Sequence, residues 1–148
     1  LCCQDNELCL RALQKELTAL PCHQPGVLYR VWSTDTVSRR DPLRIITERT
    51  RLMDSYLDTL QSTNSLEKPH QQAASQGFFE MARAFYIIDP ENACCYARER
   101  ISKGYFSPQG PAASPLYRVL FSLCGFRFSE RLASLKRGIP KASERGGA

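Results

Sequence analysis

The densest run of large apolar residues in the chain lies at residues 77–88. Its large side chains recur at spacings of three, four and three, which is the period of one buried face of an α-helix. That face comprises Phe78, Met81, Phe85 and Ile88, widened by Phe79, Ala82 and Tyr86. Glu80 and Arg83 mark the side that we expect to face solvent. So wide an apolar face predicts a central helix against which other helices pack.

Three further helices are predicted from a shared start signal, in which a side chain that can cap a helix precedes proline. Asp41-Pro42, Asp89-Pro90 and Ser114-Pro115 each place proline at the first helical position, where its missing N–H is harmless. These signals predict helices over residues 42–61, 90–103 and from 115 onward. With the central helix, which we expect to start near residue 69 or 71, and a first helix over residues 4–20, the sequence predicts five.

The first and last of these helices also carry apolar residues at helical spacing. In the first helix the repeat is Leu10, Leu13, Leu17 and Leu20, and in the last it is Leu116, Val119, Leu120, Leu123 and Cys124. We expect both sets to face the core. Gly125 is predicted to bend the last helix, and Ser129 to cap its continuation.

A chain of 148 residues is of single-domain size and can bury a core. We therefore predict one all-α helical domain over residues 1–137, packed as a bundle, with residues 138–148 as a flexible basic tail. Residues 21–41 form a long first connection, in which a short strand is expected from Val27 to Trp32. Trp32 is expected to fold back over the core, with an exposed binding anchor as the alternative.

Seven cysteines are many for this length, and they favour disulfides in an oxidising compartment over reduced, buried thiols. The candidates are Cys2, Cys3, Cys9, Cys22, Cys94, Cys95 and Cys124. Because the number is odd, one thiol is left over, and it could join two chains in a disulfide-linked dimer. The chain begins at Leu1, so we expect a processed secreted protein or a segment of a longer one.

No residue pattern predicts chemistry. Cysteine and histidine do not occur at the paired short spacings of a zinc site, and no glycine-rich phosphate loop is present. His23 and His70 both fall in predicted loops among polar residues, which does not favour a cysteine–histidine catalytic pair. No apolar run approaches the ~18 residues that span a bilayer. We therefore expect no enzymatic activity, no cofactor and no metal.

Basic residues are concentrated late in the chain. From Arg98 onward there are ten arginine and lysine residues against three glutamates, a net charge of +7, whereas residues 1–97 have ten against twelve. A basic face could meet an acidic partner, a polyanion or a membrane surface, or could simply be solvated. Arginine joins charge to a planar stacking surface, which suits interfaces. The candidate partner-binding residues are Arg98, Arg118, Arg127 and Arg131.

The leading hypothesis is a secreted, non-enzymatic helical protein that binds another protein, such as a receptor. Its layout resembles that of helical secreted signalling proteins, which have long crossover connections and disulfides. The first alternative is an intracellular helical adaptor excised from a longer protein, with its cysteines reduced. The second is a basic nucleic-acid or membrane-surface binder, although Phe126-Arg127-Phe128 is better explained by core packing than by nucleic-acid stacking.

Overall fold

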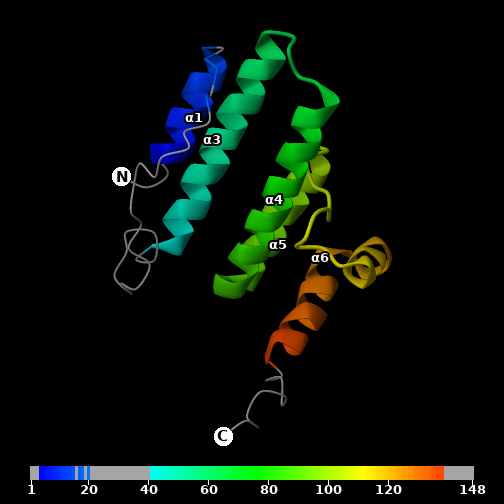
Figure 1. Cartoon of the computed structure of the whole chain (residues 1–148). Helices are drawn as coiled ribbons and strands as arrows, with labels where there is room; N and C mark the ends of the chain where they lie inside the picture. The colour runs from blue at the N-terminus through cyan, green and yellow to red at the C-terminus, as the bar shows by residue number, and fades with distance from the viewer. Residues whose placement is uncertain (1–3, 16, 19, 21–40, 139–148) are drawn as a thin grey trace, which may run out of the picture. The chain divides into compact units, whose positions relative to one another are not determined.

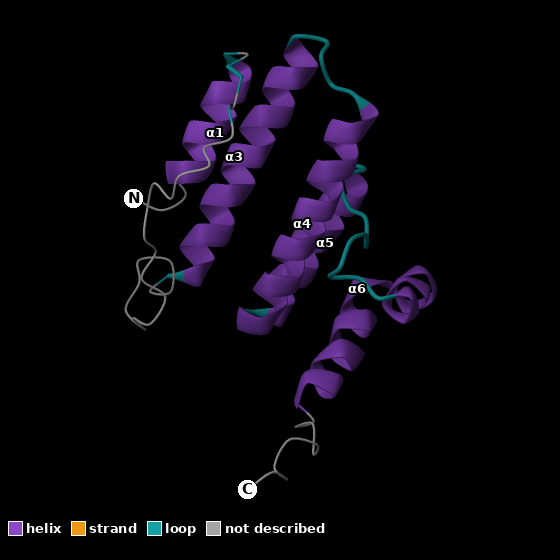
Figure 2. Cartoon of the chain, in the orientation of Figure 1, coloured by secondary structure: helices purple, strands orange, loops and turns teal. Residues whose placement is uncertain are grey.

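The structure is a computed structural model that describes residues 4–15, 17, 18, 20 and 41–138. The described residues form five helices and no strand, so the all-α prediction is confirmed (Figures 1 and 2). The chain divides into two compact units, residues 1–66 and 67–148, which are described separately. The prediction of a single domain over residues 1–137 stays a prediction.

The first unit contains α1 (Gln4–Gln14) and α3 (Pro42–Ser62), which lie side by side (Figure 1). The Gln14 side-chain amide donates to the Thr59 hydroxyl at 3.3 Å and links the two helices. The predicted first helix over residues 4–20 was too long. The Leu17 N–H bonds to the Ala12 carbonyl, which closes the helix end as a Schellman-type cap does.

The leucines at the end of α1 are therefore not core residues, as we had expected. Leu13 is 57% exposed, and Leu17 and Leu20, which lie beyond the helix, are 60% and 85% exposed. Leu10 is half-buried. The periodic leucine pattern continues past residue 14, but the helix that would place its members on one face does not.

α3 starts as its sequence predicts. The Asp41 carboxylate accepts from the Arg44 backbone N–H at 3.0 Å, and Pro42 occupies the first helical position. The helix buries Ile46, Leu52 and Leu57. The capping and proline signals together identify the first residue of this helix correctly.

The second unit begins with α4 (Lys68–Ile88) and α5 (Pro90–Ser102), which pack against each other (Figure 1). Asp89 lies between them, and its carboxylate accepts from the Asn92 backbone N–H at 3.1 Å and from the Asn92 side chain at 2.6 Å. Small side chains form the contact: Ala82 and Ala93 are fully buried, and Ala97 is 1% exposed. Their size lets the two backbones approach closely.

The central helix is the predicted core element, with a correction at its C-terminal end. Phe78, Phe79 and Ala82 are fully buried, and Met81 is 7% exposed. Ile88, which we had placed on the buried face, is 41% exposed, because it is the last residue of α4 and the chain turns into α5 directly after it. Apolar residues at a helix end have fewer packing partners.

α6 (Pro115–Gly138) is broken at Gly125, where φ is 74° and ψ is −179°. Figure 1 shows its yellow first segment turned away from its orange second segment. The predicted cap at its start is present, since the Ser114 hydroxyl accepts from the Tyr117 N–H at 3.3 Å. Ser129 does not recap the helix: it is buried, and its hydroxyl donates to the Gly125 carbonyl one turn earlier at 2.9 Å.

In the first segment of α6, most of the residues that we expected to face the core are exposed. Leu116, Val119 and Leu123 are 66%, 55% and 77% exposed, and Cys124 is exposed as well. The buried residue of this segment is Tyr117, at 5%. The segment is apolar nearly all round, so periodicity alone could not tell the covered side from the open one.

Several predictions fall outside the described residues. These are the strand from Val27 to Trp32, the position of Trp32, most of the long first connection, and the tail at residues 139–148.

Replacing Gly125 by alanine should destabilise the protein by about 1–3 kcal/mol, because its φ and ψ combination is accessible essentially only to glycine. A new Cβ would meet no heavy atom within 4 Å, so the loss would come from the backbone alone. Urea unfolding measures the change. The control carries D-alanine at position 125 and is made by chemical ligation at Cys124. D-alanine has the mirror-image backbone preferences of L-alanine, so it can adopt the φ and ψ of Gly125 without strain. If L- and D-alanine cost the same, the backbone explanation is wrong.

The junction at Asp89 should make stability sensitive to acid. Hydrogen bonds from the Asn92 side chain and backbone lower the pKa of Asp89 below its ordinary value. The ionised carboxylate therefore stabilises the fold above the unfolded-state pKa of about 3.9, and this contribution is lost as the pH falls through the lower folded-state pKa. Melting temperatures across the acid range should fall less steeply for Asp89→Asn than for the wild type. Asn92→Ala, which removes the largest cause, should be intermediate; an unchanged slope in both variants would contradict the assignment.

Candidate binding surface

An aromatic cluster in the second unit fixes where α6 lies relative to α4. Phe79 contacts Phe106 and Tyr117 edge-on, with ring centroids 5.6 Å apart in both pairs. Phe106 in turn contacts Phe126, again at 5.6 Å. Tyr117 belongs to the first segment of α6 and Phe126 to the second. Both segments of α6 therefore pack on the cluster around Phe79 and Phe106. This contact determines which faces of the two segments are left exposed.

A buried ion pair adds a second connection between α4 and α6. The Arg83 Nε lies 2.5 Å from a carboxylate oxygen of Glu130, whose side chain is fully buried. Arg83 also donates to the Ala112 carbonyl, and its guanidinium lies 4.8 Å from the centroid of the Tyr117 ring. The prediction that Arg83 faces solvent was wrong. Its side chain is 19% exposed because α6 brings Glu130 to that side of the helix.

Arg100 is a second charged residue that the fold takes out of solvent. It is 4% exposed, and its guanidinium lies 4.5 Å from the centroid of the Phe78 ring and 5.3 Å from that of Tyr96. A guanidinium over ring faces at this range is a cation–π contact. One of the basic residues late in the chain thus serves the core of the second unit.

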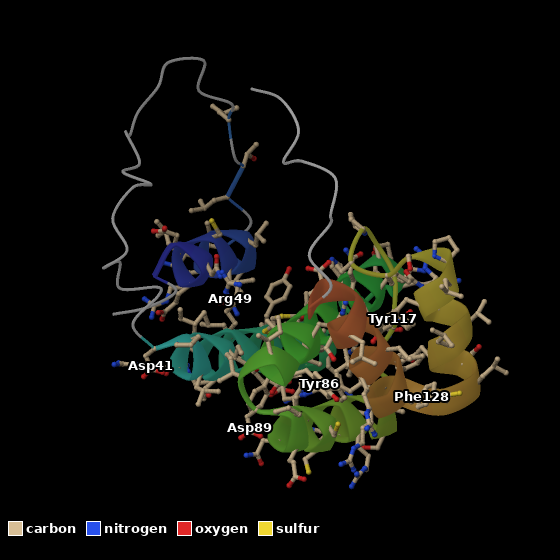
Figure 3. The ribbon with its side chains drawn as sticks, turned by 90° about the horizontal axis from the view of Figure 1, so that it is seen from below. Asp41, Arg49, Tyr86, Asp89, Tyr117 and Phe128 are labelled. Carbon is tan, nitrogen blue, oxygen red and sulfur yellow. The ribbon has the colours of Figure 1, made fainter. Side chains whose placement is uncertain are left out.

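The four candidate partner-binding arginines are all exposed. Arg98 of α5 and Arg127 of α6 both act on one half-buried thiol: burial raises the pKa of Cys94, and the positive charge of Arg127 and, more weakly, that of Arg98 oppose the rise. The structure therefore brings these two arginines to the same region from different helices. Figure 3 shows the neighbouring Phe128 on the second segment of α6.

The other two candidates are arranged differently. Arg131 follows Arg127 by four residues, one helical turn along the second segment of α6. Arg118 lies on the first segment, beyond the break at Gly125, and its Nε donates to the Ala113 carbonyl at 3.0 Å. The candidate surface is thus defined by Arg98, Arg127 and Arg131, which we call the arginine surface. Arg118 lies apart from it along α6.

The described cysteines are not joined by disulfides. Cys9, Cys95 and Cys124 are exposed thiols, and Cys94 is a half-buried one. The remaining candidates, Cys2, Cys3 and Cys22, lie outside the described residues, so any disulfide that includes them stays a prediction.

The described residues show no constellation for metal chemistry. Within them, no three His, Cys, Asp or Glu side chains gather where they could hold a metal ion. His70, which we had placed in a surface loop, lies in the first turn of α4, and its Nδ1 accepts from the Glu67 backbone N–H at 3.2 Å. His23 lies outside the described residues.

Two of the hollows that described residues line lie in the first unit. The larger, of about 760 Å³, runs along one polar face of α3 and includes Asp54 and Asp58. The smaller, of about 220 Å³, lies between α1 and α3 and includes Leu10 and Leu52. Neither brings together a nucleophile, a base and a third orienting group. In the part of the chain that the structure describes, no helix is both long and apolar enough to cross a membrane.

Comparisons of the chain with protein-family models, with curated proteins and with solved structures give no match.

The sequence reasoning missed the internal roles of Arg83, Glu130 and Arg100. A signal was present for one of them, because Glu130 follows Phe126 by four residues and so shares its face of the helix. A lone acidic residue on an apolar helix face indicates a buried partner. No pattern in the sequence identifies Arg83 as that partner, since the two lie 47 positions apart.

Arg83→Met should destabilise the protein strongly, by about 3–5 kcal/mol, because it leaves the carboxylate of Glu130 buried without its guanidinium. Glu130→Leu should cost less, since the 19% exposed Arg83 side chain can still reach water. The double variant Arg83→Met/Glu130→Leu should be more stable than Arg83→Met alone. Guanidinium unfolding of the three variants measures this order. Strictly additive losses would show that the two residues do not interact.

Proposed function

We propose that the protein is a secreted, non-enzymatic helical protein that acts by binding an acidic surface of another protein, such as a receptor. The arginine surface of Arg98, Arg127 and Arg131 is the contact that we assign to it.

The observation that supports this proposal most is the sign of the exposed charge on α6. Between residues 115 and 135 the only acidic residue is Glu130, and it is fully buried against Arg83. Arg118, Arg127 and Arg131 remain exposed. Over this stretch the helix therefore presents positive charge alone, which favours an acidic partner by complementarity.

Arginine is also the suitable cation for a protein contact. Its planar guanidinium pairs with both oxygens of a carboxylate and stacks on aromatic rings, so it contributes geometry as well as charge. Four of the five basic residues of α6 are arginines, and Lys136 is the exception. A general polyanion binder would need only charge, whereas this selection of residue type favours a shaped protein surface.

One observation favours the alternative of an intracellular adaptor. Cys9, Cys94, Cys95 and Cys124 are unbonded, as thiols of a protein from a reducing compartment would be. Intact mass after alkylation of free thiols, on natively produced protein without reductant, separates the two. Six oxidised cysteines and one alkylated, or a disulfide-linked dimer, support secretion; seven alkylated cysteines overturn it.

Charge reversal tests the contact itself. Wild type and Arg98→Glu/Arg127→Glu are applied to an array of purified extracellular receptor domains, and the affinity of each positive domain is measured. We expect a loss of at least about tenfold in the double variant, because two attractive charge pairs become repulsive.

The matched control is Arg44→Glu/Arg49→Glu, which makes the same charge change at two exposed arginines of α3. It should bind like the wild type, and the melting temperatures of both variants should stay close to that of the parent. If the control loses as much affinity as the test variant, net charge rather than the arginine surface governs binding. If no receptor domain binds, the proposed function fails.

A further inference from the structure

The second segment of α6 exposes a row of large apolar side chains. Phe128, Leu132 and Leu135 follow at spacings of four and three, so they lie along one side of the helix. They are 47%, 37% and 62% exposed. The opposite side, with Phe126 and Glu130, is buried in the second unit. This apolar row therefore faces away from the core that holds the helix in place.

A row of positive charge runs beside it. Arg127 directly precedes Phe128, and Arg131 directly precedes Leu132, so each arginine lies about 100° around the helix from its apolar neighbour. Both arginines are exposed. The segment thus presents an apolar row and a parallel cationic row to the same surroundings.

The dimensions of this pair of rows indicate what covers them. From Phe128 to Leu135 the helix rises roughly 10 Å, or about two turns. An apolar row about two turns long corresponds to the contact made by one helix that packs on another. The i and i+4 spacing of the arginines matches acidic residues spaced by one turn on a facing helix.

Two other occupants compete with a partner helix for this surface. A second copy of α6 would place arginine against arginine, because the described residues 115–135 expose no acidic side chain. Segments that bind anionic lipid surfaces carry clusters of roughly four to eight lysine or arginine residues. The second segment of α6 carries Arg127, Arg131, Lys136 and Arg137, so a lipid surface competes with a partner helix, and the vesicle experiment below separates the two.

We propose that the second segment of α6 binds an acidic amphipathic helix of a partner protein. The apolar face of that helix covers Phe128, Leu132 and Leu135, and its carboxylates pair with Arg127 and Arg131. This inference rests on the proposed protein-binding function and names the partner's chemistry and shape. The motif expected in the partner is an acidic pair four residues apart beside an apolar stripe of helical period.

The test selects binders from a displayed library of random peptides of ~15 residues, long enough for a helix of about four turns. The target is the full-length protein. The recovered peptides should share the acidic pair and the apolar stripe, and circular dichroism should show that they gain helicity on binding. If no peptide is enriched, or if the enriched peptides lack acidic residues, the proposal is overturned.

Two variants place the binding site. Leu132→Glu puts a negative charge in the apolar row, and Arg127→Glu/Arg131→Glu reverses the cationic row. Each should lower the affinity of the selected peptides by at least about tenfold. The matched controls, Leu123→Glu and Arg118→Glu, lie on the same helix before Gly125 and should bind as the wild type does. Equal losses in test and control variants overturn the assignment to the second segment.

The competing occupants have their own outcomes. Co-sedimentation with phosphatidylserine vesicles that Leu132→Glu abolishes, without peptide binding, would replace the helix by a lipid surface. A concentration-dependent dimer that Leu132→Glu dissociates, without peptide binding, would replace it by a second copy. If Arg98→Glu/Arg127→Glu abolishes binding of a receptor domain and Leu132→Glu does not, the proposed function stands and only the helix proposal is overturned.

Discussion

The ion pair between Arg83 and Glu130 is the interaction on which the second unit depends most. A fully buried carboxylate is tolerated only when a cation and hydrogen-bond donors compensate for the lost water, and Arg83 supplies both at 2.5 Å. The same guanidinium donates to the Ala112 carbonyl and lies over the Tyr117 ring. One side chain of α4 thereby contacts three parts of the chain: the second segment of α6, the loop that precedes α6, and the first turn of α6.

This pair also determines the electrostatic character of the surface. From Arg98 onward the chain contains ten basic residues and three glutamates, a formal net charge of +7. In the folded unit Glu130 is withdrawn from solvent, and so is Arg100, which packs on Phe78 and Tyr96. The two withdrawals cancel in the total of +7 from Arg98 onward, but along residues 115–135 the charge that faces solvent rises from +2 to +3, because only Glu130 is withdrawn there. A local count of exposed groups describes what a partner would meet better than net charge does.

Much of the fold could be predicted from local signals. The capping side chains of Asp41, Asp89 and Ser114 and the prolines after them set three helix starts, because capping is decided by residues within one turn. The central helix was found from the period of its apolar residues. Such features need no knowledge of distant segments.

Two of the errors arose where distant segments decide the outcome. The first segment of α6 is apolar on several sides, and contacts with α4 select Tyr117 rather than Leu116, Val119 or Leu123 for burial. Arg83 looked like a solvent-facing residue because its partner lies 47 positions away. The four candidate partner-binding arginines are exposed, as their charge suggests. That Arg98 and Arg127 share a neighbourhood at Cys94 required the structure.

Gly125 separates two properties that usually go together, solvent exposure and freedom to vary. It is exposed and has open space around its missing side chain, yet its φ of 74° with a ψ of −179° excludes side-chain-bearing L-residues. Leu123, two positions earlier, is 77% exposed and has ordinary helical geometry. A map of tolerated substitutions along α6 would therefore place Gly125 with the core residues. Burial alone would rank it among the most permissive positions in the helix.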